Sequence, residues 1–417
     1  MVNELRERLL LWKEWEPPKI IKREIRIPET KDIIAIIGPR RAGKTYFMFQ
    51  VIKELLDKGI PKENILYINF DDIIFRRYDL KKILEVYYEL FNPKGQIFLF
   101  LDEIQNLKDW PIWLRTLHDQ GYKIFVTGSS SKLLLREIAK ELRGRYISKI
   151  LLPFSFREFL KVKNFEFLDT PEKRGKLKNL LLEYLKFGGF PEVTFLENKI
   201  DKREKLLSIF ETTFYRDLVE RYRIREIEIA KELLEFLISN ISNLISITKI
   251  HNTFRTFGIN VSKRTLWKYY NYMLESLIIF ETKIFTYSKR KEMLSPRKIY
   301  ANDLGIANLP KEQKIGTLME NLVYLELFRK GLEPRYYLVN NKEIDFVFKE
   351  NGKIKAIEVT YELDNEHIRK LEEAIKRLNA EGIIITWDYE EEITKNNRKI
   401  RITPLWKWLL NVRDETI

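Results

Sequence analysis

The segment from Gly38 to Thr45, GPRRAGKT, constrains the fold of this chain more than any other part of its sequence. It fits the pattern G-x-x-x-x-G-K-[ST], follows the apolar run Ile33 to Ile37, and precedes an amphipathic run that reads as a helix. The glycines let backbone N–H groups curl round phosphate oxygens, and the N-terminus of a helix adds a partial positive charge. A strand, a loop and a helix in this order predict a nucleotide site.

The residue types of this loop indicate that the ligand is ATP with Mg²⁺. Lys44 is expected to contact the β and γ phosphates, and the Thr45 hydroxyl is expected to bind Mg²⁺. The predicted contacts to ATP are Gly38, Pro39, Arg40, Arg41, Ala42, Gly43, Lys44, Thr45 and Tyr46.

A second apolar run, QIFLFLDEIQ, ends in two adjacent carboxylates, Asp102 and Glu103. Asp102 can complete the Mg²⁺ shell, while Glu103, on the other side of the chain, can polarise the attacking water. An adjacent pair suits hydrolysis better than binding alone. The sequence therefore predicts an ATPase with Lys44, Asp102 and Glu103 as catalytic residues.

Two more strand-like runs, Asn64 to Phe70 and Tyr122 to Ser130, complete a predicted α/β sheet. The extra strand between the loop and Asp102 points to the AAA+ and RecA-like branch of P-loop proteins. Ser129, just past the last of these strands, is a candidate catalytic sensor of the γ phosphate. The alternative is that Ser129 is an ordinary polar loop residue without a catalytic role.

Composition limits the class of protein and the partners. A chain of 417 residues should divide into roughly two to four domains. It has no cysteine and no apolar run near the ~20 residues of a membrane span, so we expect a cytoplasmic protein without membrane contact. Its 75 lysines and arginines exceed its 61 acids by a net charge of +14, which favours a polyanionic partner, with solubility as the alternative.

The motifs GPRRAGKT, FLFLDEIQ, LRGRY, LPFSFREFL and FGGFPEV, taken in this order, resemble archaeal AAA-family ATPases that carry a winged helix and a C-terminal nuclease-like domain. The resemblance covers nearly the whole chain. It implies an α/β P-loop AAA+ ATPase domain (1–160), a helical lid (161–235), a winged helix-turn-helix domain (236–300) and a restriction-endonuclease-like PD-(D/E)xK domain (301–417). It also implies a homo-oligomer, with a hexameric ring among the possible arrangements.

The resemblance adds three residues to the predicted nucleotide site. In AAA+ proteins an arginine between a helix and the next strand acts on the nucleotide of the neighbouring subunit, which implies Arg145 first and Arg143 second. A plain surface role is the alternative for both. Related ATPases touch adenine with a Gly-x-Pro in the lid, which implies a contact from Pro191; a turn between helices is the alternative.

Positive charge is concentrated between Lys249 and Lys298, a segment that contains 11 lysines and arginines but only 3 glutamates. TKIHNTFRTF reads as a helix, GINVS as a turn with Ser262 as N-cap, and KRTLWKYYNYMLESL as a second helix before β-like IIFETKIF. This order predicts a helix-turn-helix with a wing that carries Lys289, Arg290 and Lys291.

The second of these helices separates into an apolar and a basic face. Leu266, Tyr269, Tyr270, Met273, Leu274 and Leu277 fall at core spacing. Lys263, Arg264 and Lys268 are predicted to contact DNA phosphates, and Asn271 to reach a base edge. The alternatives are a solvated basic face, a lid and a protein-binding surface.

Near the C-terminus, Asn351-Gly352 predicts a tight β-hairpin between two runs of alternating residues. If these two residues form the loop, Glu350 pairs with Lys353, and counting back along both strands places Asp345 opposite Glu358. Their Cβ atoms would lie about 5 Å apart, which is easiest to tolerate when a divalent metal bridges the acids. A solvated rim beside a lysine is the alternative.

This hairpin resembles the PD-(D/E)xK nuclease fold, which implies Glu320, Asp345 and Glu358 as metal-binding acids. Thr360 stands where the motif has its lysine. Side chains alternate between the two faces of a strand, so Lys355 is expected on the face opposite Asp345 and Glu358. Arg369 or Lys370 on the following helix is therefore the candidate replacement for the motif lysine. We therefore expect a metal-capable, DNA-contacting domain with weak or no cleavage.

Three functional hypotheses follow from these motifs. The first is an AAA+ ATPase that couples its ATP cycle to DNA binding or remodelling. The second is an ATP-gated, metal-dependent DNA nuclease, and the third is a nucleotide-switched scaffold that binds protein through the winged helix. The sequence leaves the biological process, the preferred nucleic acid and the subunit number open.

Overall fold

The computed structural model describes residues 2–128, 140–142, 144–395 and 398–411 of the chain. The chain divides into two compact units, Met1–Leu152 and Pro153–Ile417. Among the described residues, no helix combines the length and the apolar character that crossing a bilayer requires.

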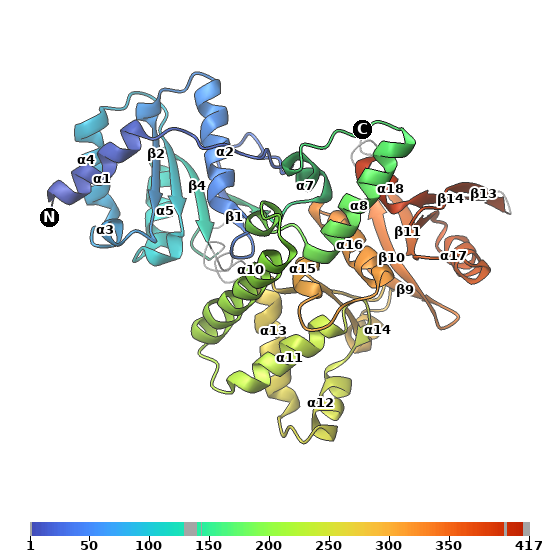
Figure 1. The fold of residues 1–417 in the computed structure, drawn as a ribbon. Coiled ribbons are helices and arrows are strands. Elements are labelled where there is room, and N and C mark those ends of the chain that lie inside the picture. Colours follow the sequence, from blue (N-terminus) through green and yellow to red (C-terminus); the bar gives the residue numbers. More distant parts are fainter. Residues whose placement is uncertain (1, 129–139, 143, 396–397, 412–417) are drawn as a thin grey trace. The chain divides into compact units, whose positions relative to one another are not determined.

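The first unit is built on a five-stranded sheet whose pairings are parallel, with the order β2-β3-β4-β1-β5 (Figure 1). The strands are β1 (Ile33–Ile37), β2 (Ile65–Asn69), β3 (Phe98–Asp102), β4 (Lys123–Gly128) and β5 (Tyr146–Ile150). The predicted α/β sheet is confirmed. In space, β4 separates β1 from β3, whereas β2 lies at the edge.

Helices cover this sheet, so its strands are apolar almost throughout. All five residues of β1 are buried. The helices are α1 (Val2–Glu14), α2 (Lys44–Asp57), α3 (Ile73–Arg76), α4 (Leu80–Phe91) and α5 (Trp110–Asp119), with 3₁₀ turns at Lys62–Asn64 and Ile104–Asn106. On α2, Phe47, Met48, Val51 and Ile52 form the buried face, as the amphipathic pattern after the loop predicts.

The second unit begins with helices. They are α7 (Phe156–Val162), α8 (Pro171–Phe187), α9 (Pro191–Thr194), α10 (Lys199–Thr212) and α11 (Ile227–Ser239), and α10 continues into a π-helical stretch at Thr213–Glu220. Ser155 starts α7 with a capping box, in which its side chain accepts from the Glu158 N–H and the Glu158 carboxylate accepts from the Ser155 N–H. The run LPFSFREFL thus contains a helix start.

The turn between α8 and α9 requires glycine for reasons of space. A Cβ on Gly189 would lie 2.2 Å from the Phe154 carbonyl oxygen. The Gly189 N–H donates to the Asp303 carboxylate at 2.7 Å, and its carbonyl accepts from the Phe154 N–H at 2.8 Å. The motif GGFP therefore serves close backbone packing.

Gly189→Ala is expected to destabilise the second unit by about 3 kcal/mol, because the backbone must shift to relieve the overlap with Phe154. Urea unfolding followed by circular dichroism measures the change. Gly175→Ala is the matched control, since Gly175 is an exposed residue of α8 and a Cβ added there would have no neighbouring atom within 4 Å. We expect it to stabilise by about 0.5–1 kcal/mol; equal effects of the two changes would contradict the packing argument.

A helix-turn-helix with a small sheet follows. It consists of β6 (Leu244–Ile245), α12 (Ile247–Thr256), α13 (Lys263–Glu275), β7 (Ile279–Thr282), α14 (Lys289–Leu294) and β8 (Arg297–Ala301). The antiparallel sheet has the order β6-β8-β7. Ser262 caps α13 by accepting from the Thr265 N–H, which confirms that prediction. Lys289, Arg290 and Lys291, which are predicted to lie on the wing, form the first turn of α14 between β7 and β8.

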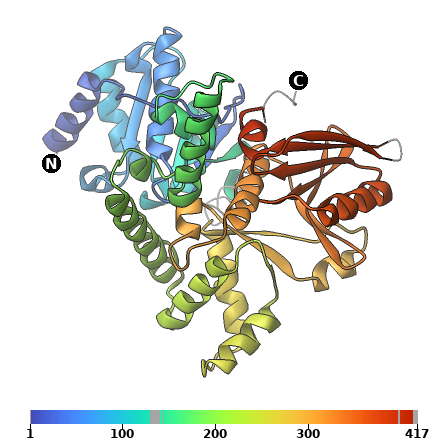
Figure 2. The same cartoon turned by 45° about the vertical axis from the view of Figure 1, so that its right-hand side comes forward.

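The C-terminal part contains a six-stranded mixed sheet, order β13-β14-β12-β11-β10-β9, which is seen from a second direction in Figure 2. The elements are α15 (Leu304–Ala307), α16 (Ile315–Arg329), β9 (Arg335–Val339), β10 (Lys342–Glu350), β11 (Lys353–Val359), α17 (Asn365–Leu378), β12 (Glu381–Thr386), β13 (Glu391–Lys395), β14 (Arg398–Pro404) and α18 (Leu405–Asn411). Leu371, Ala374 and Ile375 of α17 pack on this sheet.

The hairpin between β10 and β11 has the predicted loop and register. Asn351 and Gly352 both have positive φ, at 49° and 79°, as a type I′ turn requires. Glu350 pairs with Lys353, and the pairing continues to Phe346 and Ile357. This prediction is confirmed.

Candidate nucleotide site and a second carboxylate cluster

The loop Gly38–Gly43 has the backbone shape that its glycines predict. A Cβ on Gly38 would lie 2.1 Å from the Leu151 carbonyl oxygen, so only glycine fits there. Gly43 caps α2 with a φ of 93°, a left-handed conformation that other residues rarely adopt. Lys44 is buried, and its Nζ donates to the carbonyls of Gly38 at 3.1 Å and Pro39 at 3.0 Å. The ammonium therefore lies against the loop that is predicted to hold the phosphates.

Arg23 supports this loop and has no part in the sequence predictions. Its guanidinium is buried and donates to the carbonyls of Ala42 at 2.9 Å and Leu152 at 2.6 Å. Its backbone N–H donates to Gln50 Oε1 on α2 at 2.8 Å. Arg23 thus ties the segment before β1 to the loop. A single arginine outside any motif gives no sequence signal for such a role.

Asp102 is the centre of a hydrogen-bond network at the carboxyl end of β3. Thr45 Oγ1 donates to Asp102 Oδ2 at 2.7 Å across 57 residues of sequence. The Tyr67 hydroxyl donates to the same oxygen at 2.9 Å, and Thr127 Oγ1 donates to Oδ1. The structure therefore brings together the two residues predicted to bind Mg²⁺. The sequence predictions missed Tyr67 and Thr127; both lie in strands that flank β3, but neither belongs to a motif.

The environment of Asp102 suits a cation. Burial raises the pKa of Asp102, while the hydrogen bonds from Thr127 and Thr45 lower it and the nearby Glu103 raises it. A buried carboxylate with a raised pKa gains from a positive partner. One carboxylate and one hydroxyl, completed by phosphate oxygens, form a donor set that Mg²⁺ prefers. The residues present therefore fit the predicted ion.

Glu103 follows directly and is only partly buried. Its φ of 51° is left-handed, which is uncommon for a residue other than glycine and is often found at functional sites. Its N–H donates to Thr127 Oγ1 at 3.1 Å, and its carboxylate accepts from the Gln105 amide. Thr127 therefore holds the Asp102 carboxylate and the backbone of Glu103.

Four further residues are predicted to belong to the nucleotide site. Ser129 and Arg143 lie outside the described residues. Arg145 forms an ion pair with Asp119, and half of its side chain is exposed. Pro191 begins α9 in the second unit, where it follows the turn described above.

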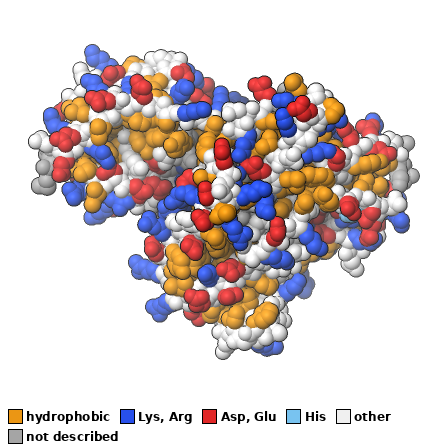
Figure 3. All heavy atoms as spheres, in the orientation of Figure 1, with side chains coloured by type: hydrophobic (Ala, Val, Ile, Leu, Met, Phe, Trp, Pro, Cys, Tyr) orange, Lys and Arg blue, Asp and Glu red, His pale blue; other side chains and the backbone are white. Residues whose placement is uncertain are grey.

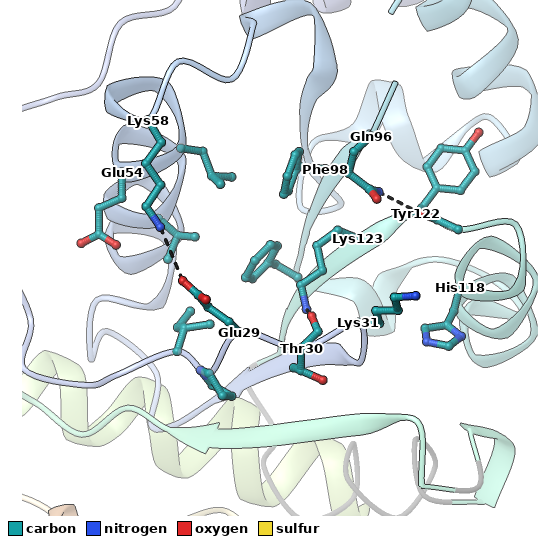
Figure 4. Close-up of a pocket in the computed structure, with 16 residues that line it drawn as sticks. Glu29, Thr30, Lys31, Glu54, Lys58, Gln96, Phe98, His118, Tyr122 and Lys123 are labelled. Carbon is teal, nitrogen blue, oxygen red and sulfur yellow. Dashed lines mark hydrogen bonds and ion pairs between the residues drawn. The ribbon is translucent and has the colours of Figure 1, made fainter. Parts of the chain in front are cut away.

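A cavity of about 580 Å³ lies at the other end of the sheet of the first unit (Figure 4). Phe98 and Lys123, the first residues of β3 and β4, line it, together with Lys58 at the C-terminal end of α2. Lys123 Nζ donates to the carbonyl of Thr30 at 2.6 Å. Since the loop Gly38–Gly43 follows the carboxyl end of β1, this cavity is separate from the predicted nucleotide site.

The predicted DNA-contacting lysines and arginine lie on the exposed face of α13. Lys263, Arg264 and Lys268 are exposed, and within the described part of the chain none of the three forms an ion pair. Lys268 Nζ lies 5.7 Å from the centre of the Tyr272 ring. Figure 3 shows hydrophobic, acidic and basic side chains mixed at the surface around α11 and α12. Asn271 donates from its amide to the Trp267 carbonyl at 2.7 Å, within its own helix.

Asp345 and Glu358 are both buried, so the alternative of a solvated rim is wrong. Lys298 of β8, a residue that the sequence predictions missed, reaches the same place and is 1% exposed. Its Nζ lies 2.7 Å from Glu320 Oε1 and 2.9 Å from Asp345 Oδ1, and it also pairs with Glu343. We call these residues, with Glu358 and Lys370, the carboxylate cluster.

Lys370 of α17 is one of the two candidate replacements for the motif lysine, and it forms an ion pair with Glu358. Arg369 is exposed instead. Lys355 pairs with Glu350 at 2.8 Å, away from the cluster, as the alternation predicts. Thr360 is buried, and its hydroxyl donates to the Glu362 carbonyl at 2.6 Å.

The charged groups of the cluster change one another's pKa values. Burial alone would lower the pKa of Lys298, but Asp345, Glu320 and Glu343 outweigh burial and hold that pKa well above its usual value. Burial and Asp345 raise the pKa of Glu358 well above its usual range and raise the pKa of Glu320 to about 8. Across the described residues, no three acidic or histidine side chains are grouped so as to hold a metal ion. The metal predicted at Asp345 and Glu358 stays a prediction.

Comparison with protein families divides the chain into three matched regions. A family model described as an AAA domain matches residues 30–160. Two models described as domains of unknown function, DUF8612 and DUF4143, match residues 178–313 and 315–408.

Two similar proteins span nearly the whole chain. An uncharacterized protein of Methanocaldococcus jannaschii is 40% identical over 94% of this chain and 91% of its own length. An uncharacterized protein of Haemophilus influenzae is 30% identical over 93% of this chain and 96% of its own length.

Similarity to solved structures is weaker. AMPPCP-bound DnaA from Aquifex aeolicus matches with 15% identity and a TM-score of 0.27, over 57% of this chain and 80% of that chain. PCH-2 of C. elegans matches with 15% identity and a TM-score of 0.24, over 66% and 65%. Scores this low carry no inference about function.

The matched AAA domain and the two relatives that cover nearly the whole chain show the family. This chain belongs to the family of the M. jannaschii and H. influenzae proteins and contains an AAA-type ATPase domain.

Proposed function

We propose that the protein hydrolyses ATP at the loop Gly38–Thr45 and couples this cycle to DNA binding or remodelling. The observation that carries the ATPase part is the 2.7 Å hydrogen bond from Thr45 Oγ1 to Asp102 Oδ2. It joins the end of the loop Gly38–Thr45 to the acidic end of β3. Glycine geometry at Gly38 and the position of Lys44 support the same conclusion.

Each residue of the site has a distinct role in this proposal. Bound Mg²⁺ would neutralise charge on the β and γ phosphates. Thr45 and Asp102 would hold the ion, and Lys44 would exchange its contacts with the loop carbonyls for contacts with phosphate oxygens. Glu103 accepts a proton from, or orients, the attacking water. Tyr67 and Thr127 keep the Asp102 carboxylate oriented.

The quaternary arrangement remains part of the proposal. In a homo-oligomer, Arg145 would leave Asp119 and contact the nucleotide of a neighbouring subunit. Its half-exposed side chain is compatible with this exchange.

The division of residues 161–417 into a lid, a winged helix and a nuclease-like domain is likewise proposed. The elements β6, α12, α13, β7 and β8 follow one another in the order of a winged helix.

DNA is proposed to bind the basic face of α13. Its three exposed positive charges, which have no carboxylate partner among the described residues, can replace counterions on phosphates at little cost. Lys289 of α14, by contrast, is already paired with Glu292 at 3.0 Å. Asn271 has its amide engaged within the helix, so the proposal rests on phosphate contacts rather than base readout.

Replacing Lys263, Arg264 and Lys268 together by alanine is expected to weaken DNA binding about uniformly across sequences. The slope of log affinity against log salt should fall by about three, roughly one for each lost phosphate contact. Fluorescence anisotropy with a labelled duplex and a labelled single strand, at several salt concentrations, measures both quantities. ATP turnover with and without DNA tests the coupling.

The matched control replaces Lys82, Lys176 and Lys399, three surface lysines that are paired with Glu85, Glu172 and Glu392. This variant loses the same net charge and should keep the salt slope. Salt-independent affinity, or equal losses in both variants, would remove the DNA part while leaving the ATPase part intact. Retained binding of a protein partner with no DNA effect would favour the scaffold instead.

A further inference from the structure

The carboxylate cluster surrounds an ammonium group rather than an open space. Lys298 Nζ contacts carboxylate oxygens of Glu320, Glu343 and Asp345. An ammonium has three N–H donors and no acceptor, so three carboxylate acceptors satisfy it completely. Charge and hydrogen bonding are therefore both matched at this position.

The residues of the cluster do not fit the divalent metal ion that the resemblance to nucleases implies. Both oxygens of Asp345 are in use, Oδ1 by Lys298 at 2.9 Å and Oδ2 by the Val359 N–H at 2.8 Å. Glu358 Oε1 is held by Lys370. In the described part of the chain, only Glu358 Oε2 among these four oxygens lacks a partner. The predicted metal-binding pair, Asp345 and Glu358, therefore offers one open oxygen, fewer than the several oxygen ligands that Mg²⁺ or Mn²⁺ needs.

The strand that carries Lys298 holds the ammonium firmly in place. β8 is the central strand of its sheet, where Lys298 pairs with Leu244 on β6 and with Thr282 on β7. Two residues further along, the Tyr300 hydroxyl donates to Glu320 Oε1 at 2.9 Å. Moving Lys298 out of the cluster would therefore break strand pairing and leave the buried Asp345 and the partly buried Glu320 and Glu343 without their counter-charge.

We propose that the Lys298 ammonium takes the place of a divalent metal ion in the carboxylate cluster and fastens β8 to β10 and α16, so that the site binds no metal and cuts no DNA. The proposal goes beyond the ATPase function and does not depend on it. Its tests therefore use the full chain without nucleotide.

The first experiment measures Mn²⁺ binding to the natural protein by electron paramagnetic resonance, with Asp345→Asn as the comparison. We expect the two isotherms to coincide, because Asp345 belongs to no metal site. A saturable Mn²⁺ site that is present in the natural protein and lost in Asp345→Asn would overturn the proposal.

The second experiment removes the ammonium with Lys298→Met, which keeps most of the side-chain volume. Glu320, Glu343 and Asp345 then face one another without a cation, so Mn²⁺ should bind at least about tenfold more tightly than to the natural protein. Mn²⁺ should also raise Tm relative to EDTA, and adding Asp345→Asn should abolish both effects.

Lys355→Met is the matched control, because it removes a hairpin lysine that pairs with Glu350 away from the cluster. It should gain no Mn²⁺ affinity. A folded Lys298→Met protein without such a gain would contradict the replacement of a metal by the ammonium. If Lys298→Met fails to fold even with Mn²⁺, the comparison of the natural protein with Asp345→Asn decides the question.

Discussion

Glu103→Gln should bind ATP and fail to hydrolyse it. Glutamine keeps the size and the hydrogen-bonding capacity of the side chain but cannot accept a proton from water, so turnover should fall by about 100-fold or more. Because Asp102, Thr45 and Lys44 are untouched, ATP affinity should stay within about twofold. Phosphate release measures turnover, and a fluorescent ATP analogue measures affinity.

The control for this change is Glu29→Gln, which alters an almost fully exposed glutamate beside the cavity at the opposite end of the sheet. It should leave both quantities unchanged. If Glu103→Gln turns over ATP at the natural rate, the catalytic assignment is wrong, whereas loss of binding would point to a structural role at the left-handed turn.

Lys44→Ala should abolish ATP binding at micromolar concentrations, with an affinity loss of about 100-fold or more. The ammonium of Lys44 lies against the carbonyls of Gly38 and Pro39, where the phosphate chain is predicted to sit. Its removal leaves the phosphates without their main positive partner from the protein. Titration with the fluorescent analogue measures the loss, and circular dichroism verifies the fold.

Lys58→Ala is the matched control, because Lys58 caps the other end of the same helix and is largely exposed. Affinity for ATP should not change there. Unaltered binding in Lys44→Ala would contradict the location of the phosphates, and with it the ATPase part of the proposed function.

Local patterns predict the elements that carry the nucleotide site. The spacing of Gly38, Gly43 and Lys44 indicates the loop, and the apolar runs before Gly38 and Asp102 indicate two strands that the structure contains. The hairpin at Asn351-Gly352 is predictable to its register, because a two-residue turn of this type leaves few alternatives. In each case neighbouring residues determine the conformation through backbone sterics and hydrophobic periodicity.

Side chains that act through distant contacts are not predictable in this way. Thr127 holds the Asp102 carboxylate and the backbone of Glu103 from β4, and Arg23 holds the loop from the segment before β1. Lys298 lies within a basic segment whose charge suggests an exposed face, yet its side chain is buried among acids from α16 and β10. Composition gives the charge of a segment but not the direction in which one lysine points.

The amino-acid sequence by itself determined the glycine-rich loop before α2, the acidic end of β3, the two helices α12 and α13 joined by a turn, and the hairpin, because each depends on residues close together along the chain. Only the tertiary structure decided which groups meet: Thr45 with Asp102, and Lys298 with the acids around Asp345. Electrostatic and hydrogen-bond partners depend on distances of about 3 Å between segments far apart in sequence, and only the packing of strands and helices sets those distances.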